Sequence, residues 1–236
     1  KLPITTILFA LGFSKEKIIN TFYTVSKYTY DTNSKMWITD FNPDNYKRPI
    51  KLSYDLIDSK NNKKLLSKGE KLNFIIAKKF QEKGLKSILS TNEQIVGKYI
   101  STDIKDEKNE IIVGAGFDIT EEQLEKITNS NVKNLNIVNI DPINKGPYIL
   151  ETLKIDKNSN KNDALNDIYK VLRPGEAPTV EIAEDVFKNL YFNKDRYDLS
   201  EVGRVKLNSK LNLNRDAKDN TLNSEDIIAI IKFMLD

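Results

Sequence analysis

The sequence predicts an α+β protein in which a separately folded α+β insertion interrupts a mainly helical part. Three observations support this prediction. The hydrophobic period changes from helical to alternating at Phe22, an internal repeat occupies the middle, and Pro- and Gly-containing punctuation at 141–147 precedes a helical C-terminal third. The predicted boundaries are 1–22 and 146–236 for the helical part and 23–145 for the insertion.

The N-terminal region predicts a helix followed by a β-hairpin. Ser14 is placed to cap a helix over Lys15–Phe22, whose apolar residues recur at helical spacing. From Phe22 to Tyr30 the residues alternate with period two, which is typical of a half-buried strand. Asp31–Ser34 then offers a turn before Lys35–Phe41, so we expect two antiparallel strands here.

The middle of the chain contains an internal repeat. Gly69–Ile88 and Gly116–Leu135 can be aligned, and each predicts a turn, a short amphipathic helix and a strand. Between the copies, Gln94–Ile104 and Glu110–Val113 are expected to form strands around a turn. Two pseudo-equivalent β-α-β units joined by a hairpin would form a compact module. The alternative is chance similarity between two helices rich in Lys and Glu.

The C-terminal third predicts a series of helices. Asn162 is placed to cap a helix over Asp163–Leu172, which Arg173–Pro178 ends because proline cannot continue a helix. Thr179 is expected to cap the next helix, and the last helix is expected to start at Ser224. An apolar helix at the final residue, together with Lys1 in place of an initiator Met, favours an excised fragment.

The composition excludes several classes of site. The chain has no histidine and no cysteine, which excludes Ser-His-Asp and Cys-His nucleophilic sites, Cys/His zinc sites, disulfides and haem ligation. Neither GxxxxGK[ST] nor GxGxxG occurs. Carboxylate pairs, Lys Schiff bases and all-oxygen Ca²⁺ or Mg²⁺ sites remain open. The residues alone therefore do not identify an enzyme, and we assign no catalytic residue.

The lengths of the apolar runs and the net charge indicate which location and which partners to expect. Stretches such as Ile7–Phe13 are far shorter than the ~20 residues of a membrane-spanning helix, and no signal-peptide pattern is present. We therefore expect no membrane contact and a cytoplasmic protein. The net charge of +3 is too weak to indicate nucleic-acid binding by itself.

Two acidic patterns have ordinary structural explanations. Asn212–Asn223 faintly resembles an oxygen-rich Ca²⁺ loop, but Ala217 stands where such a loop needs glycine, so turn-and-cap chemistry explains it better. The adjacent carboxylates Glu121/Glu122 and Glu184/Asp185 lie near predicted helix N-termini, which the helix dipole favours. We expect no metal site and no catalytic pair among them.

Arginine is rare in this lysine-rich chain, and four of its five arginines lie in the last third. Two interpretations of the segment Tyr191–Asn208 stay open. In one, it is a core-anchored loop in which Asp195 and Asp198 pair with Arg196 and Arg204. In the other, basic side chains of this segment and one arginine before it form a predicted phosphate surface. Its members are Arg173, Arg196, Arg204 and Lys206.

Two long motifs carry a resemblance to a known family. The run Ile168–Thr179, followed by Leu190–Asn208, closely resembles the lobe of the β subunit of bacterial DNA-directed RNA polymerases. The opening Lys1–Leu8, the stretch Gly146–Leu153 and the final Asp226–Asp236 fit the same family in the same order.

The resemblance implies that 23–145 is the lineage-variable insertion of the lobe, its external 1 region. It implies a multisubunit nucleotidyltransferase that copies DNA into RNA with Mg²⁺ held on the β′ subunit, so this chain itself would carry no cofactor and no catalytic residue. The implied partners are DNA, the β′, α and ω subunits and the σ factor, with the lobe forming one wall of the downstream-DNA cleft.

Two other interpretations of the sequence remain open. A stand-alone protein-interaction module could bind a partner through the aromatic-rich hairpin Phe22–Phe41. An enzyme that uses buried carboxylates would need a cleft lined by Asp or Glu.

Overall fold

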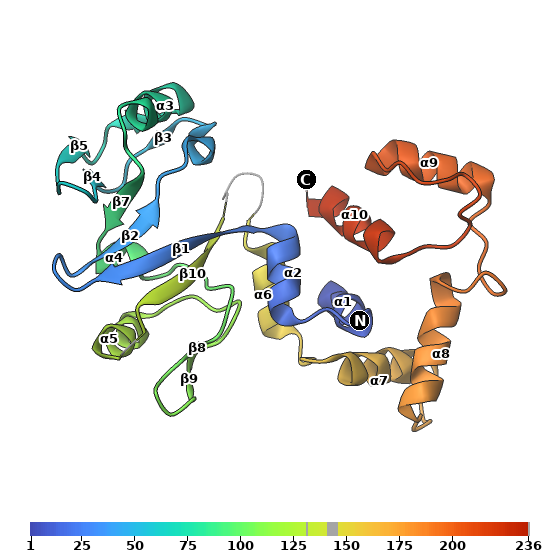
Figure 1. Cartoon of the computed structure of the whole chain (residues 1–236). Coiled ribbons are helices and arrows are strands. Elements are labelled where there is room, and N and C mark those ends of the chain that lie inside the picture. Colours follow the sequence, from blue (N-terminus) through green and yellow to red (C-terminus); the bar gives the residue numbers. More distant parts are fainter. Residues whose placement is uncertain (131, 141–145, 236) are drawn as a thin grey trace. The chain divides into compact units, whose positions relative to one another are not determined.

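The period change at Phe22 coincides with a change from helices to strands in the computed structural model (Figure 1), which describes residues 1–130, 132–140 and 146–235. Two units are distinguished. Unit 1 contains Lys1–Phe22 and Ile140–Asp236, and unit 2 contains Tyr23–Asn139. The predicted mixture of helices and strands is confirmed. The punctuation at 141–145 and the boundary at 145 lie outside the described residues, and the assignment of an insertion stays a prediction.

Unit 1 is helical. Its described helices are α1 (Ile4–Ala10), α2 (Lys15–Phe22), α6 (Tyr148–Ile155), α7 (Lys161–Leu172), α8 (Val180–Tyr191), α9 (Glu201–Leu211) and α10 (Ser224–Leu235). Helix α1 is central, because it contacts α2, α6 and α7, and α7 also packs on α8. Thr5 and Thr6, both fully buried, donate their hydroxyls to the Asp156 carboxylate at 2.5 and 3.1 Å. Burial of these hydroxyls is therefore compensated by a charged acceptor.

Local capping explains where these helices begin. Ser14 Oγ accepts from the Lys17 amide, and Thr179 Oγ1 accepts from the Ile182 amide, as the sequence predicts. The cap of α7 is Asn160 rather than Asn162, so that helix begins two residues earlier than expected. Both asparagines can supply a capping oxygen, and the residue pattern alone did not distinguish them.

Unit 2 is built on a six-stranded sheet with the order β10-β1-β2-β7-β4-β5. These strands are β1 (Thr24–Asp31), β2 (Met36–Asp40), β4 (Leu56–Asp58), β5 (Lys64–Leu66), β7 (Ser87–Ser90) and β10 (Asn134–Asn139). Neighbouring strands pair antiparallel, and the predicted hairpin is β1–β2. Thr24 and Asn139 are register partners, so the two ends of unit 2 lie side by side.

The shorter elements of unit 2 correct part of the sequence analysis. They are η1 (Pro43–Tyr46), β3 (Ile50–Lys51), β6 (Lys71–Leu72), α3 (Phe74–Glu82), α4 (Asn92–Ile95), β8 (Ile104–Lys105), β9 (Ile111–Val113) and α5 (Glu121–Asn129). The expected continuous strand Gln94–Ile104 is wrong, because a Thr91–Gln94 capping box starts α4 there. Strands β8 and β9 do pair antiparallel on the two sides of the predicted turn. The paired strands are antiparallel, so they are not the parallel strands of β-α-β units.

The two proposed repeat copies each contain a helix followed by a strand, α3 then β7 and α5 then β10. Leu72 and Ile119, which the alignment equates, are both buried before the helix. Asn73 and Thr120 cap the two helices. Asn131, which follows the helix of the second copy, lies outside the described residues. The equivalence of the copies stays a prediction.

Unit 2 encloses two separate apolar clusters. The larger one centres on Trp37, which is fully buried and donates Nε1–H to Asn92 Oδ1 at 2.9 Å. The smaller one is drawn from the middle of the sequence. Its buried members are Phe41, Leu56, Leu72, Ala77 and Leu85. The two clusters divide the unit into a part around 41–88 and a part that contains the β1–β2 hairpin and α5.

Candidate nucleic-acid interface

Helix α9 carries two of the four residues of the predicted phosphate surface. Its N-cap is Ser200, whose side chain accepts from the Gly203 amide. Ser200 has φ +63° and ψ 158°, a backbone region that is sparsely populated outside glycine. The Leu199 amide donates to the Asn220 carbonyl at 2.7 Å, which helps to hold this turn in place.

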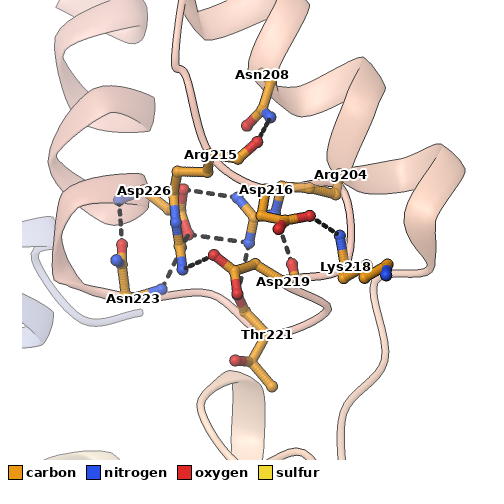
Figure 2. A network of polar contacts seen from close by, with 9 residues as sticks. All are labelled: Arg204, Asn208, Arg215, Asp216, Lys218, Asp219, Thr221, Asn223 and Asp226. Carbon is orange, nitrogen blue, oxygen red and sulfur yellow. Dashed lines mark hydrogen bonds and ion pairs between the residues drawn. The ribbon is translucent and has the colours of Figure 1, made fainter.

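Arg204 lies one turn into α9 and its side chain is fully buried. Its guanidinium binds Asp226 in a bidentate manner, with Nη1–Oδ1 at 2.8 Å and Nη2–Oδ2 at 3.2 Å (Figure 2). Nε donates to the Asp219 carbonyl at 2.7 Å, and Nη2 donates to the Thr221 carbonyl at 2.5 Å. Charge and hydrogen-bond donors are thus both matched inside the protein, as a buried arginine requires.

Asp226 is the shared acceptor of this network and is also fully buried. Besides Arg204, it accepts from Arg215 Nη1 at 2.7 Å and from the Asn223 amide at 3.0 Å. The Asp226 amide donates in return to Asn223 Oδ1 at 2.9 Å, which forms a reciprocal cap at the start of α10. One carboxylate therefore stabilises a helix end and two arginines together.

The loop between α9 and α10 is fixed by the same arginines. Arg215, whose side chain is 20% exposed, also binds Asp219 at 2.9 Å, and its carbonyl accepts from Asn208 Nδ2 at 2.7 Å. Asp216 Oδ1 accepts from the Lys218 amide at 2.9 Å. These oxygens act as turn acceptors and arginine partners, in line with the turn-and-cap explanation of the segment that faintly resembles a Ca²⁺ loop.

The structure corrects the assignment of Arg204. A phosphate cannot reach a guanidinium that is fully buried and occupied by Asp226 and two carbonyls. The expected intramolecular partner was also wrong: the Asp198 carboxylate instead accepts from the Ser200 amide at 2.8 Å. Sequence reasoning missed Asp226 because it lies 22 residues from Arg204; the available signal was the local Asn223–Asp226 capping pattern.

The other three members of the predicted surface are exposed: Arg173, Arg196 and Lys206. Arg173 follows the last turn of α7, where its guanidinium carbon lies 5.9 Å from the centre of the Tyr169 ring. The Tyr169 hydroxyl donates to Glu176 at 2.5 Å, and this bond raises the pKa of Tyr169. Arg173 is therefore held against a ring while its charge stays accessible.

Arg196 and Lys206 lie on either side of the Arg204 anchor in the sequence. Arg196 belongs to a turn after α8, in which its amide donates to the Asn193 carbonyl at 3.1 Å. Lys206 lies on α9, two residues beyond Arg204. Lys206 therefore lies on the helix that Arg204 ties to Asp219 and to Asp226 of α10.

The placement of the acidic side chains among the described residues bears on metal binding. Within 1–130, 132–140 and 146–235, no group of three or more Asp and Glu side chains is gathered to hold a metal ion. No helix of the described ranges is long and apolar enough to span a membrane.

Comparison with known proteins gives one consistent result. Residues 124–236 match the family RNA polymerase Rpb2, domain 2. The whole chain is 38% identical to the DNA-directed RNA polymerase subunit beta of Caulobacter sp. strain K31 and 41% identical to those of Agrobacterium fabrum and Rickettsia massiliae. It spans 17% of the length of each of these relatives.

Proposed function

Because the chain belongs to the family of bacterial RNA polymerase β subunits, we propose that it forms part of the wall of the downstream-DNA cleft during transcription. In this role Arg173, Arg196 and Lys206 contact DNA phosphates. The observation that supports this proposal is a difference in exposure within unit 1. Arg204 is buried in an internal ion pair, whereas the other three cations are exposed to solvent.

Phosphate contacts suit a polymerase, because it must hold every sequence that it transcribes. Contacts to the backbone position a protein on DNA and carry no sequence information directly. Arginine and lysine supply them through charge, with release of the counterions condensed on DNA. A few exposed cations suffice for one wall of a cleft, in agreement with the net charge of +3.

The chain itself is proposed to be non-catalytic. The nucleotidyltransferase reaction would belong to the assembled enzyme, with its Mg²⁺ on the β′ subunit, and the chain would work in the cytoplasm alongside the β′, α and ω subunits and the σ factor. Measurable Mg²⁺-dependent nucleotide incorporation or hydrolysis by the pure chain would contradict this part of the proposal.

We further propose that unit 2 is the inserted external domain of a lobe formed by unit 1. The pairing of Thr24 with Asn139 supports this, because an insertion whose ends lie side by side can be removed with little strain on its host. Replacing 23–145 by a short Gly/Ser linker should leave a helical protein that unfolds cooperatively. Loss of that transition would show that the two units need a common core.

The test of the phosphate contacts uses the complete polymerase with a triple substitution R173A/R196A/K206A in its β subunit. We expect the slope of log K for the promoter complex against log salt to fall by about three, at ~0.9 per lost contact, with base selectivity unchanged. K210A is the matched control, because Lys210 is also exposed on α9 but is not proposed to contact DNA. An unchanged slope in the triple variant would refute the contacts.

The alternative of a stand-alone interaction module has less support. Its proposed binding element, the aromatic hairpin, directs Trp37 and Tyr28 into the larger apolar cluster of unit 2. Aromatic side chains that are used in a core are not free to anchor a partner. The similarity of the whole chain to a segment of a much longer subunit also favours the polymerase.

A further inference from the structure

A second basic surface covers one part of unit 2. Residues 41–90 contain twelve Lys and Arg against five Asp and Glu, a net charge of +7, whereas residues 91–130 contain four against nine, a net charge of −5. All twelve cationic side chains are exposed, and we call them the lysine surface. They are Lys47, Arg48, Lys51, Lys60, Lys63, Lys64, Lys68, Lys71, Lys78, Lys79, Lys83 and Lys86.

The separation of charge follows the packing. The segment that carries the lysine surface folds around the smaller apolar cluster, whose buried members all come from 41–85. Its elements η1, β3, β4, β5, β6 and α3 include the β4–β5 edge of the sheet, and α3, β3, β4 and β5 lie together at one end of unit 2 (Figure 1). The segment 91–130, whose net charge is negative, contributes its apolar side chains to the larger cluster instead. A chain of nearly balanced charge thus presents a strongly basic part.

Like charges on this surface face one another. Lys51 and Lys71 are register partners in the antiparallel pair β3–β6, and like charges directly opposite across two strands destabilise the pair. Lys79 and Lys83 are four residues apart at the end of α3, where like charges also repel, although the helix dipole offsets part of this cost. These repulsions do not stabilise the fold. A bound polyanion would neutralise the facing charges, and this is the simplest explanation for their placement.

We propose that the lysine surface binds the phosphate backbone of double-stranded DNA, as a contact separate from Arg173, Arg196 and Lys206. Lysine is depleted from protein–protein interfaces, whose strongest contacts use Trp, Tyr and Arg. Here eleven of the twelve cations are lysines. Lysine side chains can neutralise successive backbone phosphates and release the condensed counterions, whatever the base sequence. The inference rests on the proposed function only in taking DNA as the polyanion.

The test measures binding of the full 236-residue chain to a short fluorescent DNA duplex by anisotropy over a series of KCl concentrations. The variant is K51Q/K71Q/K79Q/K83Q, and the matched control K105Q/K108Q/K126Q/K133Q removes the same charge from other exposed lysines of unit 2. We expect the variant to bind at least about tenfold more weakly at low salt, with a salt slope lower by about 3–4. Its melting midpoint should not fall, because the facing repulsions are removed.

The other outcomes are distinguishable. If both quadruple variants bind DNA equally weakly, the effect depends only on the net charge of the chain and not on the lysine surface, which overturns the proposal. Unchanged DNA binding with loss of poly-glutamate binding would assign the lysine surface to an acidic protein, which also overturns it. The R173A/R196A/K206A variant in the same assay separates the two DNA proposals. If only this variant loses DNA binding, the lysine surface is refuted. If only K51Q/K71Q/K79Q/K83Q loses DNA binding, the unit 1 contacts are refuted.

Discussion

Replacing Arg204 by alanine is expected to destabilise unit 1 by about 3–5 kcal/mol. The guanidinium is fully buried, and both of its Nη atoms bind the equally buried Asp226 carboxylate. After truncation that carboxylate would keep Arg215, but the carbonyls of Asp219 and Thr221 would lose their donors. The expected loss lies in this range because an unpaired buried charge and unsatisfied carbonyls add to one another.

The assay is urea unfolding of the whole chain, monitored by far-UV circular dichroism, whose helical signal comes mostly from the helices of unit 1. Fluorescence of Trp37, the single tryptophan, follows unit 2 and should keep its midpoint. In a double-mutant cycle, R204A and D226A together should cost less than the sum of the single changes. E122A, which breaks the exposed Glu122–Lys126 pair, is the control and should cost at most ~0.5 kcal/mol.

Two results would refute this reasoning. A loss below about 1 kcal/mol for R204A would mean that the site relaxes or hydrates without difficulty, as exposed ion pairs do. Additive effects of R204A and D226A would mean that the two side chains do not act as one buried unit.

Further predictions concern pH and the core of unit 2. Hydrogen bonds from Lys161 and Lys188 lower the pKa of Glu184. The ionised Glu184 therefore stabilises the fold fully above the ordinary glutamate pKa, and this stabilisation is lost as the pH falls through the lowered pKa. E184Q should therefore show a smaller drop in melting midpoint on acidification than the parent chain, and parallel pH profiles would contradict this. Trp37→Ala should lower the free energy of urea unfolding by about 3–5 kcal/mol, because it leaves a cavity in the larger apolar cluster and removes the donor to Asn92. A decrease of under ~1 kcal/mol would contradict this, because it would mean that the neighbouring side chains fill the cavity.

Elements with strong local signals could be predicted from the sequence. The β1–β2 hairpin follows from alternation and from the turn at Asp31, whose carboxylate accepts from Asn33 and Ser34 amides. The caps of α2 and α8 follow from Ser14 and Thr179. These features need only residues a few positions apart, so the sequence contains all that is required to find them.

Features that depend on distant residues could not be predicted in the same way. Ile100 lies within the stretch that is predicted to be a strand, but it forms only an isolated bridge, and its amide and carbonyl bond to Phe117 and Gly116. Arg204 looked like a surface cation because lysine and arginine patterns do not reveal a partner such as Asp226 on another helix. Apolar periodicity does not show which charged residue becomes buried, since burial depends on the partner that tertiary packing supplies.

Exposed cations of unit 1 are proposed to bind DNA, whereas Arg204 stabilises the fold. The most direct measurement compares R196A and R204A for both the melting midpoint of the chain and the salt slope of the promoter complex of the complete polymerase. We predict that R196A lowers the slope by about one with an unchanged midpoint, and that R204A lowers the midpoint strongly. A lowered midpoint with an unchanged slope for R196A would contradict the account.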